Sequence, residues 1–220
     1  MKYKVNFKSL STKQKIEYVW DYYKWHVVIL VFVISMIVST VQNAINYKEP
    51  LLNIIMLNSY GAMMNTEDHG FEEFFERYNY DSFDGAVEIK KDLTFSREGE
   101  LNYEDYQNYE VLFSLLVGQE YQMILGTGEK TLDFLNQGFL SDLSTILSKD
   151  ILERYKNQLV YFEDEGKKYP CAIILSNNQW LAENNYYDGE CYVGILNQEN
   201  ISEVVIDFTE FLLSYSGSCE

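Results

Sequence analysis

Histidine, cysteine and proline are scarce in this 220-residue sequence, which contains two, three and two of them. Serine and cysteine nucleophiles normally need a histidine within hydrogen-bond reach, and His69 is the one histidine outside the apolar segment near the amino terminus. No serine lies in a Gly-x-Ser-x-Gly turn. The sequence therefore predicts no catalytic residues, and an enzyme such as a surface hydrolase is the least favoured class.

Ligands for a metal or a cofactor are also few. His69 precedes Glu72, Glu73 and Glu76 on a predicted helix, and one histidine with two carboxylates can bind a divalent cation. A second histidine is missing, so a solvated acidic helix face is the favoured interpretation. "MILGTGEKT" resembles a phosphate-binding loop, but it lacks the Gly-Lys-Ser/Thr order of such loops and the third glycine of a dinucleotide site. It predicts a plain strand-to-helix turn, and we expect no metal and no cofactor.

Basic residues are rare beyond the first fifth of the chain. Residues 1–44 contain six lysines and two acidic residues, so of the 17 basic and 34 acidic residues in the chain, 11 and 32 remain in 45–220, a net charge of -21. Affinity for nucleic acid or anionic lipid depends on lysine and arginine that neutralise phosphates. The composition therefore excludes nucleic acid as a partner.

Charge is absent from 23 consecutive residues, 25–47, which as a helix would reach about 34 Å and cross a bilayer core of about 30 Å. The eleven Val, Ile, Leu and Phe residues of 27–41 favour insertion by about 5 kcal/mol in sum. A buried core helix rarely lacks charge for so long. Cleavage as a signal peptide fits poorly, because 26 residues precede the apolar run and Gln42 and Ala44 make a weak cleavage site. We expect an uncleaved signal anchor.

The flanks of this segment predict its orientation. Lys8, Lys13, Lys15 and Lys24 precede it and Lys48 alone follows closely, so the amino terminus is expected in the cytoplasm and the rest outside the cell membrane. Ser11 and Gln14 form a predicted capping box at the start of an aromatic-rich helix. The predicted parts are a cytoplasmic segment 1–25, a transmembrane helix 26–45, a stalk 46–50, an extracytoplasmic domain 51–214 and a tail 215–220.

Strand and helix patterns alternate in the domain, which predicts an α/β fold with one mixed sheet and helices on both faces. "LVYF" and "YPCAIILS", separated by the turn "EDEGKK", predict an antiparallel hairpin. The predicted strands cover 51–58, 85–93, 121–125, 159–162, 169–176 and 191–197, and the predicted helices cover 67–79, 103–118, 129–138 and 201–214.

Two segments resemble a known family. "LFSLLVGQEYQMILGTGEKTLDFLNQGFLSDLSTIL" and the ending "YVGILNQENISEVVIDFTEFLLS" are similar to parts of bacterial extracellular solute-binding proteins of ABC transporters. The resemblance covers roughly residues 51–148 and 171–214, and it implies one lobe of a type II periplasmic binding protein. Gln122 stands where such proteins usually carry aspartate, and fewer than 50 residues separate Ser144 from Cys191, where the family inserts its second lobe. The resemblance thus implies a single-lobe relative that has lost capture by closure.

The segment "SNNQWLAENNYYDGECY" combines Trp180, Tyr186, Tyr187 and Tyr192 with amides and small residues. Such mixtures are typical of recognition surfaces. We expect these aromatics to bind a ligand or partner, with the alternative that Trp180 packs on the sheet and the rest is loop. A pocket formed with Gly126 and Gly128 would favour a solute, whereas a flat aromatic face would favour a protein.

Cys171 and Cys191 each lie near the start of a predicted strand, and an extracytoplasmic location would let a disulfide persist. Two alternatives stay open, a bridge between them or unpaired burial. Cys219 lies in the tail and is expected to be free.

These features predict a single-pass membrane protein whose extracytoplasmic domain binds or senses without catalysis. We expect an accessory of a membrane complex, with the lipid bilayer and a membrane or cell-surface protein as partners. The alternative is the solute-binding component of a transporter, which would take a small solute.

Overall fold

The chain forms two compact units in this computed structural model, Met1–Lys48 and Glu49–Glu220. The structure describes residues 11–46, 48–60, 69–82, 85–96, 102–164, 166–198 and 200–215. The division between the units falls inside the predicted stalk, and the residues of the predicted tail beyond Tyr215, with Cys219, lie outside the described residues.

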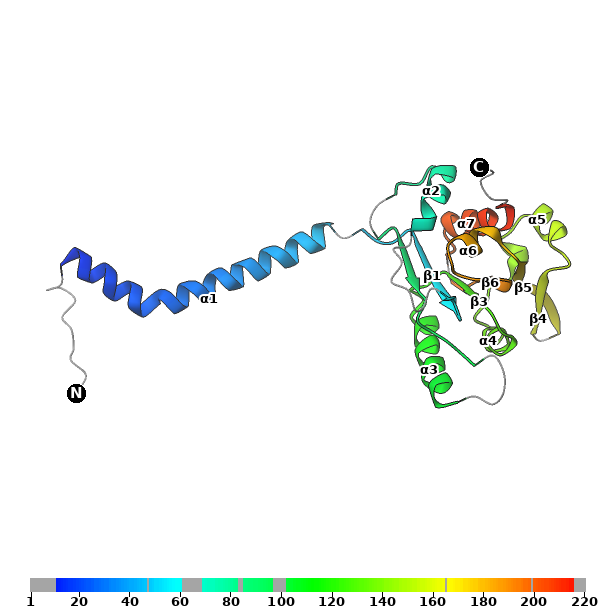
Figure 1. Cartoon of the computed structure of the whole chain (residues 1–220), viewed down its shortest axis with the longest axis horizontal. Helices are drawn as coiled ribbons and strands as arrows, with labels where there is room; N and C mark the ends of the chain where they lie inside the picture. The colour runs from blue at the N-terminus through cyan, green and yellow to red at the C-terminus, as the bar shows by residue number, and fades with distance from the viewer. Residues whose placement is uncertain are drawn as a thin grey trace. The chain divides into compact units, whose positions relative to one another are not determined.

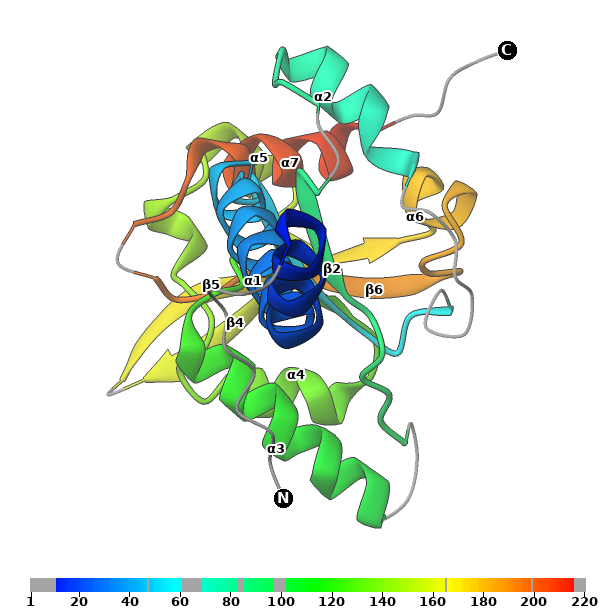
Figure 2. The ribbon, with the colours of Figure 1, turned by 90° about the vertical axis from the view of Figure 1, so that its left-hand side faces the viewer.

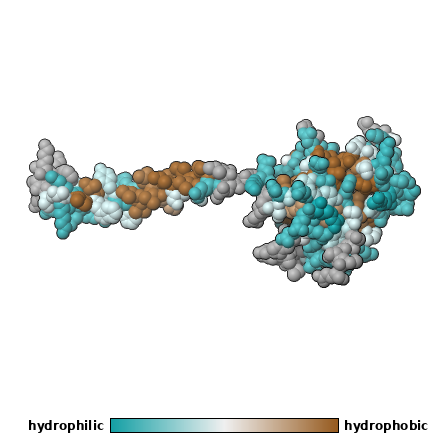
Figure 3. Space-filling model, turned by 90° about the horizontal axis from the view of Figure 1, so that it is seen from above, coloured by the Kyte–Doolittle hydropathy of each residue, from teal (hydrophilic) through white to brown (hydrophobic). Residues whose placement is uncertain are grey.

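In the first unit the structure describes α1 (Thr12–Asn46), a helix of 35 residues. The predicted capping box is confirmed, because the Gln14 N–H donates to Ser11 Oγ at 3.4 Å and the Ser11 N–H donates to Gln14 Oε1 at 3.1 Å. Thr40 Oγ1 donates to the carbonyl of Met36 one turn earlier, at 2.9 Å, so this hydroxyl has a hydrogen-bond partner inside the apolar stretch. The apolar side chains of α1 are exposed, as the brown band in Figure 3 shows. The helix is long and apolar enough to cross a membrane.

The second unit is built on one six-stranded mixed sheet with the strand order β2-β1-β3-β6-β5-β4 (Figure 1). β1 pairs in parallel with β2 and β3, and the remaining pairs are antiparallel, including the predicted hairpin of β4 and β5. The strands are β1 (Leu52–Leu57), β2 (Val87–Lys90), β3 (Met123–Gly126), β4 (Leu159–Asp164), β5 (Lys167–Ser176) and β6 (Glu190–Ile195). The predicted α/β class and mixed sheet are confirmed.

Helices cover both faces of this sheet, as Figure 2 shows. β1 is buried on both sides, so Ile54 and Met56 pack in one core and Ile55 and Leu57 in the other. The first core lies under α2 (Glu72–Tyr78), α5 (Lys149–Arg154), α6 (Gln179–Glu183) and α7 (Glu203–Ser214), and the second lies under α3 (Tyr103–Gly118) and α4 (Glu129–Leu135). Two short 3-10 turns are His69–Phe71 and Leu143–Thr145. α4 is shorter than predicted, since the chain turns after Leu135 and reaches Gly138 at φ +99°.

The start of α3 is held by a buried carboxylate. Asp105, 2% exposed, accepts hydrogen bonds from the N–H groups of Ser96 at 2.7 Å and Asn102 at 3.0 Å, while Asn102 Oδ1 accepts from the Asp105 N–H in a complete capping box. Burial opposes ionisation of Asp105, but the donors of Asn102 and Ser96 outweigh it, so the pKa of this carboxyl is lowered. At the carboxyl end of α3, Gln119 adopts a left-handed backbone conformation with φ 54°. Gly118, at which this helix was predicted to end, is its last residue.

We expect Asp105→Asn to lower the free energy of unfolding of Glu49–Glu220 by about 1–3 kcal/mol at pH 7, because two part-buried hydrogen bonds from backbone N–H groups lose their charged acceptor. Since the folded pKa is lowered, the contribution of Asp105 is present above the unfolded pKa of about 3.9 and is lost as the pH falls through the folded pKa. Urea unfolding at pH 7 and at pH 3 should show the difference between variant and wild type shrinking in acid. Asp133→Asn, at an exposed position of α4, should change stability by less than about 0.5 kcal/mol, and an equal effect of both substitutions would contradict the prediction.

Candidate functional site

The strand order places a topological switch point between β1 and β3. The connections from β1 to β2 and from β2 to β3 run in opposite directions along the sheet, so a crevice is expected at the carboxyl ends of β1 and β3. At these carboxyl ends, Asn58 and Ser59 follow β1, and Thr127 and Gly128 follow β3. Open α/β sheets bind their ligands at such a position.

Asn58 fills the bottom of this crevice. It adopts a left-handed backbone conformation, φ 57°, which asparagine tolerates better than most residues. Its Nδ2 donates to the Thr127 carbonyl at 2.9 Å, and its Oδ1 accepts from the Phe95 N–H at 2.6 Å. The amide thus joins the loops that follow three parallel strands, and both of its ends are bonded to the chain.

Two tyrosines are hydrogen-bonded within the chain near the carboxyl ends of β1 and β3. The Tyr187 hydroxyl donates to the carbonyls of Leu57, at 3.0 Å, and Leu125, at 3.2 Å, at the ends of β1 and β3. The Tyr192 hydroxyl donates to Thr131 Oγ1 at 2.9 Å on the other side of the sheet. Burial raises the pKa of both phenols, so both remain neutral donors. Among the described residues, side chains of this domain thus lie at the position where such a sheet holds a ligand.

The two glycines predicted to take part in binding serve this packing. A Cβ at Gly126 would lie 2.5 Å from the Tyr192 hydroxyl oxygen, so only glycine lets that ring approach β3. Gly128 has φ +99° at the start of α4, a conformation that L side chains rarely adopt. Both glycines therefore allow close packing at the end of β3 and the start of α4.

The structure corrects the prediction of an exposed aromatic recognition face. The predicted residues are 1%, 2%, 3% and 4% exposed, in the order Trp180, Tyr186, Tyr187, Tyr192. The Trp180 ring packs against Phe71, Phe208 and Phe211 at centroid distances of 5.1, 5.4 and 5.9 Å, and its Nε1 donates to the Gly70 carbonyl at 2.9 Å. The alternative interpretation, that Trp180 packs on the sheet, describes the structure.

The amides around these rings build turns and caps. Asn178 accepts from the Leu181 N–H at 3.1 Å as the N-cap of α6, and it donates to the Leu212 carbonyl at 2.7 Å. Asn177 and Asn185 hold left-handed backbone conformations at φ 53° and 56°. A mixture of aromatics and amides that is typical of a binding loop therefore encodes a short, tightly packed helix.

The candidate disulfide is absent. Cys171 and Cys191 are both free and buried on the paired strands β5 and β6. Cys191 stands opposite Leu175, four residues from Cys171, and the two thiols belong to cores on opposite faces of the sheet. A bridge between them is excluded by this register, and unpaired burial describes both.

Burial raises the pKa of Cys171 to about 11 and that of Cys191 to about 12. In a Cys219→Ser chain we expect no thiol to react with an aromatic disulfide reagent at pH 8 while the domain is folded. Two thiols should react after unfolding in denaturant without reductant. Fewer than two after unfolding would reveal a bridge and contradict the register.

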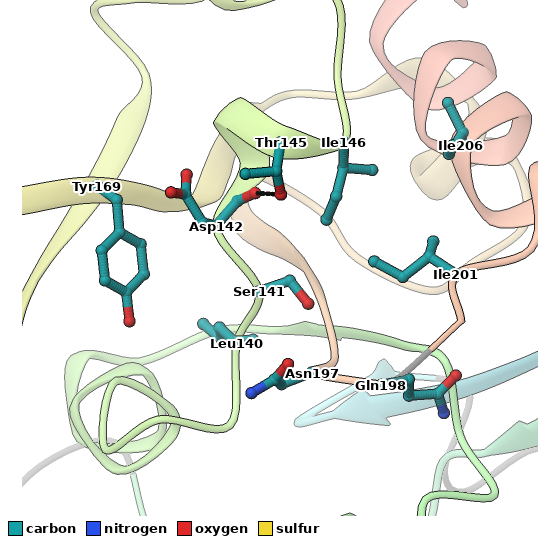
Figure 4. Close-up of a pocket in the computed structure, with 10 residues that line it drawn as sticks. All are labelled: Leu140, Ser141, Asp142, Thr145, Ile146, Tyr169, Asn197, Gln198, Ile201 and Ile206. Carbon is teal, nitrogen blue, oxygen red and sulfur yellow. Dashed lines mark hydrogen bonds between the residues drawn. The ribbon is translucent and has the colours of Figure 1, made fainter.

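An open groove of about 590 Å³ lies at the opposite ends of these strands, where β6 ends and β3 begins (Figure 4). Ile146, Ile201 and Ile206 form its apolar side. The lining residues are Leu140, Ser141, Asp142, Thr145, Ile146, Tyr169, Asn197, Gln198, Ile201 and Ile206.

Several polar groups of the groove are bonded within the chain. Ser141 Oγ donates to the Leu196 carbonyl at 3.1 Å, and Asp142 Oδ1 accepts from the Ser144 N–H at 2.9 Å as the N-cap of the 3-10 turn. Lys167 Nζ lies 3.8 Å from Asp142 Oδ2. The carboxylate thus acts as a cap with a loose ion pair, and the groove presents a lining that mixes polar and apolar side chains.

A second feature is a row of exposed apolar side chains on α3. Tyr103, Tyr106, Phe113 and Val117 are 78%, 58%, 51% and 61% exposed. A helix was predicted over 103–118 from the sequence, but this row, which lies beside the core side formed by Leu112 and Leu116, was not identified. The sequence signal that would have revealed this row is a second line of apolar residues along α3, beside the line that faces the core.

The remaining sequence candidates lie outside these features. His69 begins a 3-10 turn directly before α2, and its side chain is outside the described residues. Among the side chains that the structure does describe, no group of three or more His, Cys, Asp or Glu residues is arranged to hold a metal ion.

Comparison with known proteins found no family model, curated protein or solved structure that matches this chain. The relationship to extracellular solute-binding proteins stays a prediction. Gln122, which the resemblance alone would align with an aspartate, accepts from the Asn53 N–H at 3.1 Å and donates to Ser202 Oγ at 3.4 Å. In this chain the residue joins β1 to the start of α7.

Proposed function

We propose that this protein is a membrane-anchored, extracytoplasmic binding module that contacts a protein partner without catalysis, as an accessory of a membrane complex. The observation that carries the proposal is the row of exposed apolar side chains on α3. Water-exposed apolar rows of this kind mark interaction sites, whereas single exposed apolar residues need no explanation. The hydrogen bonds of Asn58 and Tyr187 within the chain at the strand switch point support a protein partner over a small solute.

α1 supplies the anchor in this proposal. Its exposed apolar side chains require a partner, and a bilayer suits a charge-free helix of this length. The excess of lysine before the apolar stretch supports an amino terminus in the cytoplasm and the α/β domain outside. One mixed sheet with helices on both faces is what a single lobe of a solute-binding protein would provide, and we retain that relationship as part of the proposal.

A photo-crosslinking residue at Tyr106 in the full chain, activated in intact cells, tests the proposal. We expect a covalent adduct with another protein. The same residue at Tyr161, 44% exposed on β4, is the control and should give none. Absence of a protein adduct at Tyr106 would contradict the proposed function.

The groove at the end of β6 favours a second candidate, capture of a small solute for a transporter. Its volume of about 590 Å³ lies within the range of about 300–1,000 Å³ that ligand pockets occupy. A ligand at a hundred times its dissociation constant would stabilise the domain by about 2.7 kcal/mol, a rise in melting temperature of roughly 5–10 °C. We expect no such rise for the full chain with sugars, amino acids or peptides. A rise that disappears in Ile201→Trp would establish solute capture in the groove.

A further inference from the structure

We propose that α3 binds a helix of the partner protein, and that this helix carries a lysine or arginine opposite Glu110 and a large apolar side chain that enters a cavity beside Val117. The inference rests on the proposed function and names the chemistry of the partner.

Spacing along α3 shows why a helix fits. Tyr103, Tyr106, Glu110, Phe113 and Val117 follow one another at intervals of three, four, three and four residues, which places all five on one exposed stripe. This is the a/d pattern of a coiled-coil seam, maintained over two heptads. A seam of this spacing is complemented by the apolar face of a second helix.

Glu110 defines the charge of that second helix. It is exposed at the middle of the seam, seven residues from each end, and α3 contains no lysine or arginine. A charged residue at an a position selects the partner at some cost in stability. A second copy of α3, parallel or antiparallel with the ends of its seam aligned, would place Glu110 against Glu110. Repulsion between these two carboxylates disfavours self-association through the seam. A lysine or arginine at the position of the partner helix that faces Glu110 removes this repulsion.

A cavity at the carboxyl end of α3 supplies an anchor point. It has a volume of about 260 Å³, below the usual size of a small-molecule pocket and suited to one side chain. Gln198 fixes its rim, since Nε2 donates to the carbonyls of Gln119, at 2.9 Å, and Tyr121, at 2.6 Å. Val117, Phe139 and Gln198 are among its lining residues. Side chains that fill such pockets dominate binding energy at interfaces.

The seam and the cavity form one surface. Phe113 contacts Phe139 edge-to-face, with ring centroids 5.9 Å apart, so the seam continues onto the loop after α4 that lines the cavity. Glu110 precedes Val117 by seven residues, about 10.5 Å along the helix. The basic and anchoring residues of the partner are therefore expected seven positions apart.

Charge over the whole domain supports the same partner. With 11 basic and 32 acidic residues in 45–220, the domain attracts a basic protein segment and repels anionic lipid. A membrane surface is accordingly disfavoured as the occupant of the seam.

The test uses the full chain in intact cells, with the photo-crosslinking residue at Tyr106, and compares two charge reversals on α3. Glu110→Lys should lower the adduct yield at least tenfold. Glu104→Lys, exposed on the same helix outside the seam, makes the same change in charge and should alter the yield less than twofold. Val117→Ser should lower the yield tenfold, and Val111→Ser, 42% exposed and outside the seam, should not. Unchanged melting temperatures of the variants show that each domain is folded.

Sequencing of the crosslinked partner segment completes the test. We expect an apolar helix with a lysine or arginine, and exchange of that residue for glutamate should restore the adduct with Glu110→Lys. Equal adducts from wild type and Glu110→Lys would overturn this inference and leave the proposed function standing. An adduct with lipid or with a second copy would also overturn it, and no adduct from any variant would overturn both.

Discussion

Replacing Trp180 with alanine is expected to lower the free energy of unfolding of the α/β domain by about 4 kcal/mol, because the change leaves a cavity among closely packed rings. Trp180 is 1% exposed and contacts the rings of Phe71, Phe208 and Phe211. Its loss also leaves the carbonyl of Gly70 without the indole donor. Domains of this size have a total stability of about 5–15 kcal/mol, so a large share would be lost.

Thermal unfolding of Glu49–Glu220 measures this effect, and a loss of 4 kcal/mol corresponds to a fall in melting temperature of about 8–16 °C. Tyr103→Ala is the control, because this aromatic side chain is 78% exposed and its removal should cost less than about 0.5 kcal/mol. If both variants melted like the wild type, Trp180 would not be a core residue and the predicted recognition face would regain support.

Placing two arginines in α1 is expected to release the protein from the membrane. Leu30 and Ile34 lie one turn apart near the middle of the charge-free stretch, and both side chains are exposed. Each arginine costs about 2.5–3.5 kcal/mol at the centre of a bilayer, and each lost apolar residue removes a further 0.3–0.6 kcal/mol. The sum of about 6–8 kcal/mol exceeds the favourable insertion free energy of about 5 kcal/mol from the eleven large apolar residues.

Extraction of membranes at alkaline pH measures the anchored fraction. Leu30→Arg with Ile34→Arg should move most of the protein to the soluble fraction. Leu30→Ile with Ile34→Leu conserves the apolar character and should remain in the membrane. Equal behaviour of the two chains would show that α1 does not hold the protein in the bilayer by its apolar side chains.

Local periodicity explains why most of the fold was predictable. The apolar run at 51–58 became β1, the helix predicted over 103–118 matches α3 in both bounds, and the hairpin around "EDEGKK" pairs as expected. In each case burial of one face or of both faces imposes a repeat that is visible along the chain. The mixed sheet with helices on both faces followed from this alternation of elements, whereas the strand order was not predicted.

The site was less predictable because its contacts join distant residues. Tyr187 donates to carbonyls 130 and 62 residues away, so no local pattern could show that it closes the crevice rather than facing a ligand. The faces of Cys171 and Cys191 depend on the register of β5 with β6, which spacing along the chain does not determine. The groove also escaped detection, because it gathers residues from three separate stretches, 140–146, Tyr169 and 197–206.

Every functional proposal requires the α/β domain to lie outside the cell membrane, and labelling with a membrane-impermeant maleimide tests this most directly. Asn157→Cys, in a full chain that carries Cys219→Ser, adds an exposed thiol while Cys171 and Cys191 remain buried. We predict labelling of this position in intact cells, whereas a cysteine at Lys13, before the apolar stretch, should be labelled only after the membrane is opened. Labelling of Lys13→Cys in intact cells, with Asn157→Cys protected until lysis, would contradict the orientation and the extracytoplasmic function derived from it.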